Sequence, residues 1–103
     1  MARTTFICKC RSIAHAQSVI PQILTAEGYA QILENGETVW KCGNGAWVSM
    51  KYIKIEFADD TTAHITGWVK STIGPEQNLD GVIGGLPKKQ ALKVIDRLRG
   101  AIL

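Results

Sequence analysis

The chain has 103 residues, of which 46% are hydrophobic and 20% charged, a balance that excludes a disordered protein and predicts a single folded domain over residues 1–103. Its formal net charge of +3 is too small and too scattered along the chain to indicate a nucleic-acid binder. No apolar run approaches the roughly 18 residues of a membrane-spanning helix, and residues 1–11 lack the apolar stretch of a signal peptide, so we expect a cytoplasmic protein.

The N-terminal part of the chain predicts a strand followed by a helix. Residues 4–10 are rich in β-branched and aromatic side chains. The two-residue period of a strand puts three of them on one face: Phe6, Cys8 and Cys10. Ser12 is suited to cap the helix that follows, and Gly28 is typical of the position just beyond a helix end. Pro21 lies inside this helix and lacks a backbone N–H, so we expect one kinked helix or two short helical pieces.

A β-hairpin is predicted after the helix. Residues 29–34 and residues 37–42 are both strand-like runs. They are joined by Asn35-Gly36, a pair that tolerates the two positive φ angles of a tight turn. Two adjacent antiparallel strands are therefore expected here.

A second hairpin is predicted in the middle of the chain. A β-prone stretch covers residues 46–57, and a turn at residues 58–60 leads into an alternating run over residues 61–70. Apolar side chains change faces along the first of these strands. Either a bulge or turn lies near Lys51, or both faces of the strand are partly covered.

The last part of the chain predicts a loop and an amphipathic helix. Residues 71–86 contain several glycines and form a candidate functional loop, in which a short strand at residues 79–83 is one option. Pro87 is suited to the first position of a helix. An apolar stripe then recurs at helical spacing: Leu92, Ile95, Leu98 and Ile102.

These elements predict an α+β fold with the order β-α-β-β-β-β-α. We expect a single antiparallel sheet of about five strands, with the N-terminal and C-terminal helices packed on one face. The alternative is a reduced helix-grip fold, in which the sheet wraps the C-terminal helix. In a chain of this length, any cavity that such a fold enclosed would be small.

The cysteines are weak candidates for a metal site. Cys8 and Cys10 share a strand face, Cys42 could lie on a neighbouring strand, and His64 or His15 could supply a fourth ligand. The sequence has no Cys-x-x-Cys pair, however, and free cysteine is among the most buried residue types. We therefore expect free thiols, no metal and no cofactor. Because no catalytic constellation is visible either, we expect no enzymatic activity.

A glycine-rich stretch leading into the C-terminal helix is a candidate anion site. Its backbone amides and ammonium groups would come from four residues: Gly84, Gly85, Lys88 and Lys89. Lysines near a helix N-terminus oppose the helix dipole, so a bound phosphate, acidic lipid or carboxylate would explain them. The spacing does not match a phosphate-binding loop, and the alternative is a flexible loop followed by a solvated basic turn.

Trp68 is the main candidate for an interaction surface. Like the other tryptophans, it is expected first to pack in the core. Strand alternation also places it on the same face as His64, among threonines and a lysine, so the alternative is that it marks a binding or dimer surface. Lys93 and Arg97, on the polar side of the C-terminal helix, are further candidates.

Several segments resemble a family of small bacterial domains of unknown function. They are residues 37–43, residues 51–57, the pair Gly67-Trp68 and residues 86–89. The resemblance would cover most of the chain and implies a bacterial origin and the same order of elements. It implies no activity and no site residues.

The leading functional hypothesis is a non-catalytic binding or interaction module. Its partner would be an unknown protein or a second copy of the chain bound through an exposed strand edge. One alternative is a small-ligand carrier of helix-grip type, with an apolar pocket between the sheet and the C-terminal helix. Another is weak binding of an anionic surface, lipid or nucleic acid, through the basic C-terminal helix.

Overall fold

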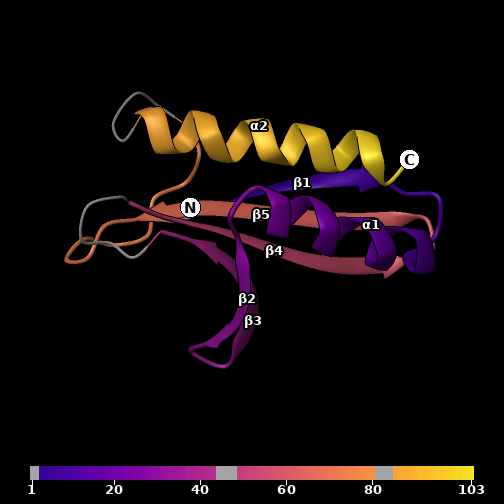
Figure 1. The fold of residues 1–103 in the computed structure, drawn as a ribbon, viewed down its shortest axis with the longest axis horizontal. Helices are drawn as coiled ribbons and strands as arrows, with labels where there is room; N and C mark the ends of the chain where they lie inside the picture. Colours follow the sequence, from indigo (N-terminus) through magenta and orange to yellow (C-terminus); the bar gives the residue numbers. More distant parts are fainter. Residues whose placement is uncertain (1–2, 44–48, 81–84) are drawn as a thin grey trace.

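The computed structural model describes residues 3–43, 49–80 and 85–103 (Figure 1). Their helices and strands follow the predicted order: β1 Thr4–Lys9, α1 Ile13–Ala26, β2 Ala30–Glu34, β3 Glu37–Cys42, β4 Met50–Asp59, β5 Thr62–Lys70 and α2 Gly85–Ala101. The strands form one antiparallel sheet, so the predicted α+β class is confirmed. Neither helix is long and apolar enough to cross a membrane.

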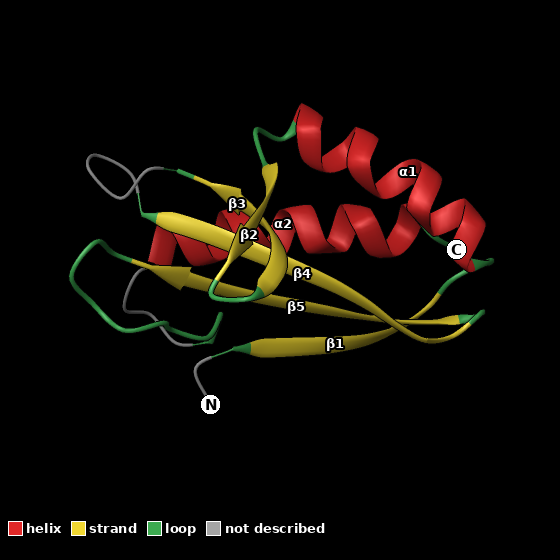
Figure 2. Cartoon of the chain, turned by 90° about the horizontal axis from the view of Figure 1, so that it is seen from below, coloured by secondary structure: helices red, strands yellow, loops and turns green. Residues whose placement is uncertain are grey.

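The order of strands across the sheet is β1-β5-β4-β3-β2, which leaves β1 and β2 at the two edges. Both helices lie on one face of the sheet (Figure 2). The β2–β3 hairpin leaves the sheet after a short pairing of β3 with β4, and its tip projects away from the helices (Figure 1). The turn has Asn35 at φ 52° and Gly36 at φ 79°, as predicted for a tight hairpin.

Helix α1 begins and ends where the sequence indicates. The Ser12 side chain accepts a hydrogen bond from the His15 amide at 3.0 Å, and Gly28 adopts a φ of 89°. The helix continues through Pro21, so the expectation of two separate pieces is wrong. Proline at this position removes only the hydrogen bond to the Gln17 carbonyl, and the buried apolar residues on either side of it hold the helix against the core.

The space between the sheet and α2 is filled by aliphatic side chains. Ile53 and Ile65 of the sheet are fully buried against Ala91, Ile95 and Leu98 of α2. The opposite side of α2 carries exposed charged residues, so the sheet does not enclose this helix as the helix-grip alternative required. Packing on one sheet face, the leading prediction, is therefore confirmed.

The other face of the sheet carries a smaller apolar cluster, formed by Val39, Met50, Tyr52 and Trp68. The Tyr52 and Trp68 rings stack with their centroids 5.2 Å apart and their planes 4° from parallel. Apolar side chains therefore pack on both faces of the sheet, which explains why the apolar residues of β4 change from one face to the other along the strand. A bulge near Lys51 is wrong, since the register shifts between Phe57 and Asp59.

The segment before α2 departs from prediction in two ways. Helix α2 begins at Gly85, so Pro87 occupies its first turn instead of its first position; a proline is tolerated there because first-turn amides have no acceptor within the helix. Of the optional strand at 79–83, Leu79 and Asp80 are not in a strand and the rest lies outside the described residues. Leu79 instead packs against Gly67. A Cβ atom added to Gly67 would lie only 2.8 Å from the Cδ1 atom of Leu79.

Arg3 holds the outer cluster in place. Its guanidinium lies 3.6 Å from the Trp68 ring centroid and donates two hydrogen bonds each to Glu37 and Glu76, at 2.8–2.9 Å. Lys54 adds a further hydrogen bond to Glu37 at 2.9 Å. These contacts join the N-terminus, the β2–β3 hairpin and the loop after β5 through charge-assisted hydrogen bonds.

The Glu37 network predicts a loss of stability in acid. Hydrogen bonds from Arg3 and Lys54 lower the pKa of Glu37 from 4.5 to about 2. A carboxyl group whose pKa is lower in the folded state stabilises fully above its unfolded pKa and loses this contribution as the pH falls. Because Glu37 is partly exposed to water, we expect a loss of about 1–2 kcal/mol between pH 5 and pH 2.

Urea unfolding of the wild type and of Glu37→Gln across this pH range measures that contribution. The two proteins should differ at pH 7, and the difference should shrink as the pH falls to 2 and below, where Glu37 becomes protonated in the folded protein. A constant difference at every pH would contradict this role for the Glu37 carboxylate.

Candidate functional site

The structure describes three of the four residues of the predicted anion site, Gly85, Lys88 and Lys89. The Lys88 side chain is buried, with 6% of the residue exposed, and its Nζ atom donates a 2.7 Å hydrogen bond to the Asp80 carbonyl. Lys89 is exposed to solvent, Gly85 is the first described residue of α2, and Gly84 lies outside the described residues. The predicted solvated basic turn is therefore wrong for Lys88, which anchors the loop to the helix.

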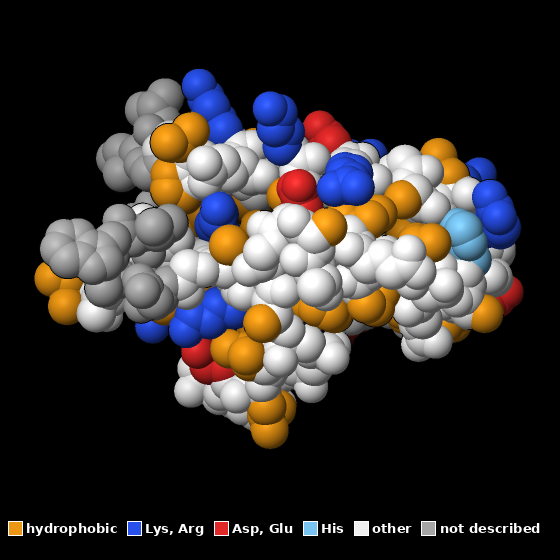
Figure 3. All heavy atoms as spheres, in the orientation of Figure 1, with side chains coloured by type: hydrophobic (Ala, Val, Ile, Leu, Met, Phe, Trp, Pro, Cys, Tyr) orange, Lys and Arg blue, Asp and Glu red, His pale blue; other side chains and the backbone are white. Residues whose placement is uncertain are grey.

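The predicted interaction surface is divided between two sides of the molecule. Trp68 lies on the predicted outer sheet face but is 2% exposed, because Arg3 and Tyr52 cover its ring, and it presents no open surface. His64 is half-buried on that same face. Lys93 and Arg97 lie instead on the solvent side of α2, where Figure 3 shows a row of basic side chains, and Arg97 also contacts Glu27 at 3.5 Å.

The cysteines lie in the fold as isolated thiols. Cys8 and Cys10 are buried under the helices and Cys42 is half-buried on β3. Burial raises the pKa of the Cys8 and Cys10 thiols. Within residues 3–43, 49–80 and 85–103, no three His, Cys, Asp or Glu side chains gather closely enough to hold a metal ion.

Strand β1 presents an open edge. The Cys10 amide donates to the Thr61 carbonyl at 2.9 Å, which fixes the alternation of hydrogen bonds along the pairing of β1 with β5. By that alternation Phe6 and Cys8 pair with β5, whereas the backbone groups of Thr5, Ile7 and Lys9 point to the open edge. The Ile7 side chain is 71% exposed. An unprotected edge with an exposed apolar side chain is a template for pairing with another strand.

A surface groove of about 420 Å³ lies between this edge and the end of α2. We call it the β1 groove; it is lined by Ile7, Cys8, Lys9, Arg99, Gly100 and Leu103. The Leu103 residue is 62% exposed, and the Arg99 guanidinium lies 5.5 Å from the Phe6 ring centroid. The β1 groove thus combines apolar surface with two cations, Lys9 and Arg99, beside the open edge of β1.

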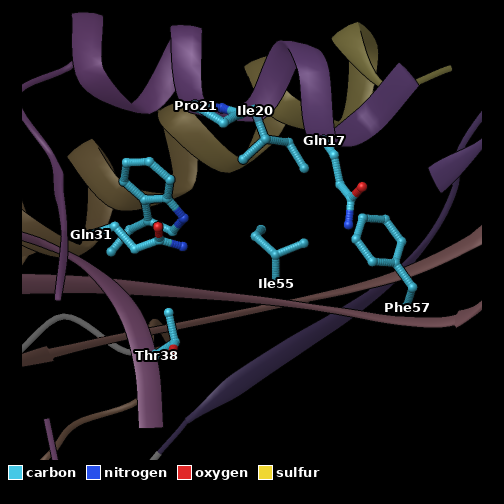
Figure 4. A pocket seen from close by; sticks show the side chains of 8 residues that line it. Gln17, Ile20, Pro21, Gln31, Thr38, Ile55 and Phe57 are labelled. Carbon is cyan, nitrogen blue, oxygen red and sulfur yellow. The ribbon is translucent and has the colours of Figure 1, made fainter. Parts of the chain in front are cut away.

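A second hollow of about 210 Å³ lies beneath α1, on the helix-covered face of the sheet and toward the β2 edge. We call it the α1 groove; its lining is Gln17, Ile20, Pro21, Gln31, Thr38, Trp40, Ile55 and Phe57. Figure 4 shows Ile20 of the helix and Ile55 of the sheet facing each other, with Gln17 and Gln31 on opposite sides of the space. It is an open groove with apolar walls and a neutral polar rim.

Neither groove was found by sequence reasoning. The strand period already placed Ile7 opposite Phe6 and Cys8, so its exposure had a signal in the sequence. Gln17, Gln31 and Thr38 form no motif and come from three separate elements. The order of strands that makes β1 an edge depends on contacts between distant parts of the chain.

Comparison with known proteins finds no matching protein family, no matching curated protein and no matching solved structure. The resemblance to a family of small bacterial domains therefore stays a prediction.

Proposed function

We propose that the protein is a non-catalytic interaction module that pairs a strand along β1, and that a second copy of the chain supplies this strand. The observation that carries the proposal is a row of backbone groups at Thr5, Ile7 and Lys9 that have no hydrogen-bond partner among the described residues, with the exposed Ile7 side chain at its centre. These backbone N–H and C=O groups can all form hydrogen bonds at once when another strand is added along the edge.

The edge is self-complementary in one antiparallel register. With the two-fold axis at Ile7, this residue faces Ile7 of the second copy, and Thr5 faces Lys9 of the second copy. Within Thr4–Lys9 all the outward backbone groups are then paired and no two like charges lie directly opposite; Arg3 and Arg11, which would face each other in this register, lie beyond the ends of the strand. The exposed apolar side chain at the centre becomes buried against its own symmetry mate, which is the arrangement of an isologous dimer.

The β1 groove supports the same interface. It runs along the seam that this pairing would create, and its exposed Leu103 side chain would be covered by the second copy. Two groups that could serve catalysis are already engaged within the fold, which favours a binding role. Cys8 is buried, and His15 Nε2 lies 2.9 Å from the Ala101 carbonyl oxygen.

Sedimentation equilibrium of Ile7→Lys tests the proposal. The substitution removes an apolar contact and places two ammonium groups opposite each other at the two-fold axis. The wild type should sediment as a dimer, and the variant should have a dissociation constant at least ~10-fold higher, equivalent to about 1.4 kcal/mol. Ile7 faces solvent in the single copy, so the variant keeps its core.

The matched control is Leu33→Lys, which changes a 75% exposed residue on β2, the opposite edge strand. This control should associate like the wild type. A monomeric wild type, or equal effects of the two lysine substitutions, would overturn the proposed interface.

A further inference from the structure

We propose that the α1 groove binds a small, uncharged, flat ring compound that carries both a hydrogen-bond donor and an acceptor, as a primary amide does. The site stands independently of the proposed dimer, because the α1 groove borders β2 and β3 and the dimer edge is β1. Three properties of the lining favour such a ligand: its lack of charge, its free polar groups and its aromatic surface.

In the part of the chain that the structure describes, the lining of the α1 groove carries no charged side chain. Its polar side chains are amides and a hydroxyl, from Gln17, Gln31 and Thr38, and the rest of the surface is apolar or aromatic. An ionic ligand would lose water here without gaining a counter-charge. The groove therefore discriminates in favour of neutral ligands.

The polar groups of the groove are available to a ligand. Among the described residues, the side chains of Gln17, Gln31 and Thr38 make no hydrogen bond with one another or with the rest of the protein. A ligand N–H can donate to a side-chain oxygen of a glutamine or of Thr38, and a ligand carbonyl can accept from a glutamine amide.

The walls of the α1 groove have the aromatic surface and the spacing to hold one flat ring. Trp40 and Phe57 are half-buried aromatic residues of neighbouring strands, and Ile20 and Ile55 close the groove from above and below. Such surfaces favour stacking or edge contacts with a flat ligand. A volume of about 210 Å³ is below the range of roughly 300–1,000 Å³ typical of sites for drug-sized ligands, so a single substituted ring fits the space.

Titration with benzamide and with benzoate, followed by NMR of ¹⁵N-labelled protein, tests this site. The two probes share a ring and a shape, but only benzoate is charged at neutral pH. Benzamide should shift the Trp40 indole signal and the Gln17 and Gln31 side-chain signals in a saturable way, with a dissociation constant of roughly 1 mM for so small a ligand. Benzoate should bind at least ~10-fold more weakly.

A variant pair locates the binding. Thr38→Lys places a charge at an exposed position in the groove and should weaken benzamide binding at least ~10-fold. Thr25→Lys adds the same charge at an exposed position of α1 outside the groove and should leave it unchanged. Equal binding of the two probes, absence of saturable shifts at the groove residues, or no effect of Thr38→Lys would overturn the proposal.

Discussion

Replacing Leu98 with alanine should lower the free energy of unfolding by about 3 kcal/mol, the largest effect that we expect from a single substitution. Leu98 is completely buried where α2 packs against the core, so alanine leaves a cavity as well as losing apolar contact. For a domain of this size, such a loss corresponds to a fall in Tm of roughly 12–24 °C. Urea and thermal unfolding followed by circular dichroism measure both quantities.

Leu86→Ala is the matched control for this substitution. The same side chain is removed from the same helix, at a position that is 68% exposed. Its effect should stay within about 0.5 kcal/mol. Comparable losses for Leu86→Ala and Leu98→Ala would contradict the assignment of the buried face of α2.

Replacing Arg3 with alanine should cost about 2 kcal/mol of unfolding free energy, although Arg3 lies next to the N-terminus. The substitution removes the main partner of both Glu37 and Glu76 and uncovers the Trp68 ring. Two like charges would be left close together on the outer face of the sheet. Urea unfolding at pH 7 measures the loss.

Arg11→Ala removes the same kind of side chain from an exposed position at the other end of β1. It should change stability by less than about 0.5 kcal/mol. Equal effects of Arg3→Ala and Arg11→Ala would show that the Arg3 network contributes nothing beyond an ordinary surface charge.

Local sequence patterns were sufficient to predict most of the fold. The Asn35-Gly36 turn, the Ser12 cap and the Gly28 terminus depend on backbone geometry within a few residues, and the structure has all three. The apolar stripe of α2 and the mixed parity of β4 also follow from periodicity alone. These features are predictable because each is decided by neighbours in the sequence.

The features that were missed depend on distant segments. The sequence predicts that Lys88 is solvated, but its ammonium group donates a hydrogen bond to the Asp80 carbonyl. No local sequence rule predicts this contact. Trp68 lies on the predicted face, but its contacts with Arg3 and Tyr52, which are distant in the sequence, show that it is covered. Burial of a polar or aromatic side chain in such places is a tertiary property.

The candidate sites also combine features that local sequence predicts with features that depend on distant segments. Exposure of Ile7 follows from the strand period, whereas its place on an edge follows from the order β1-β5-β4-β3-β2. The α1 groove requires a helix, a hairpin and a central strand to meet, and no local pattern in the sequence predicts that meeting. Function therefore had to be argued from the assembled surfaces.

Amide hydrogen exchange along β1, measured at several protein concentrations, tests the proposed interface most directly. Phe6 and Cys8 pair with β5 within one copy, so their amides should be protected at every concentration. The amides of Thr5, Ile7 and Lys9 should become protected only as the concentration rises and the second copy binds. Rapid exchange at these three amides at all concentrations, with Phe6 and Cys8 still protected, would contradict pairing along β1.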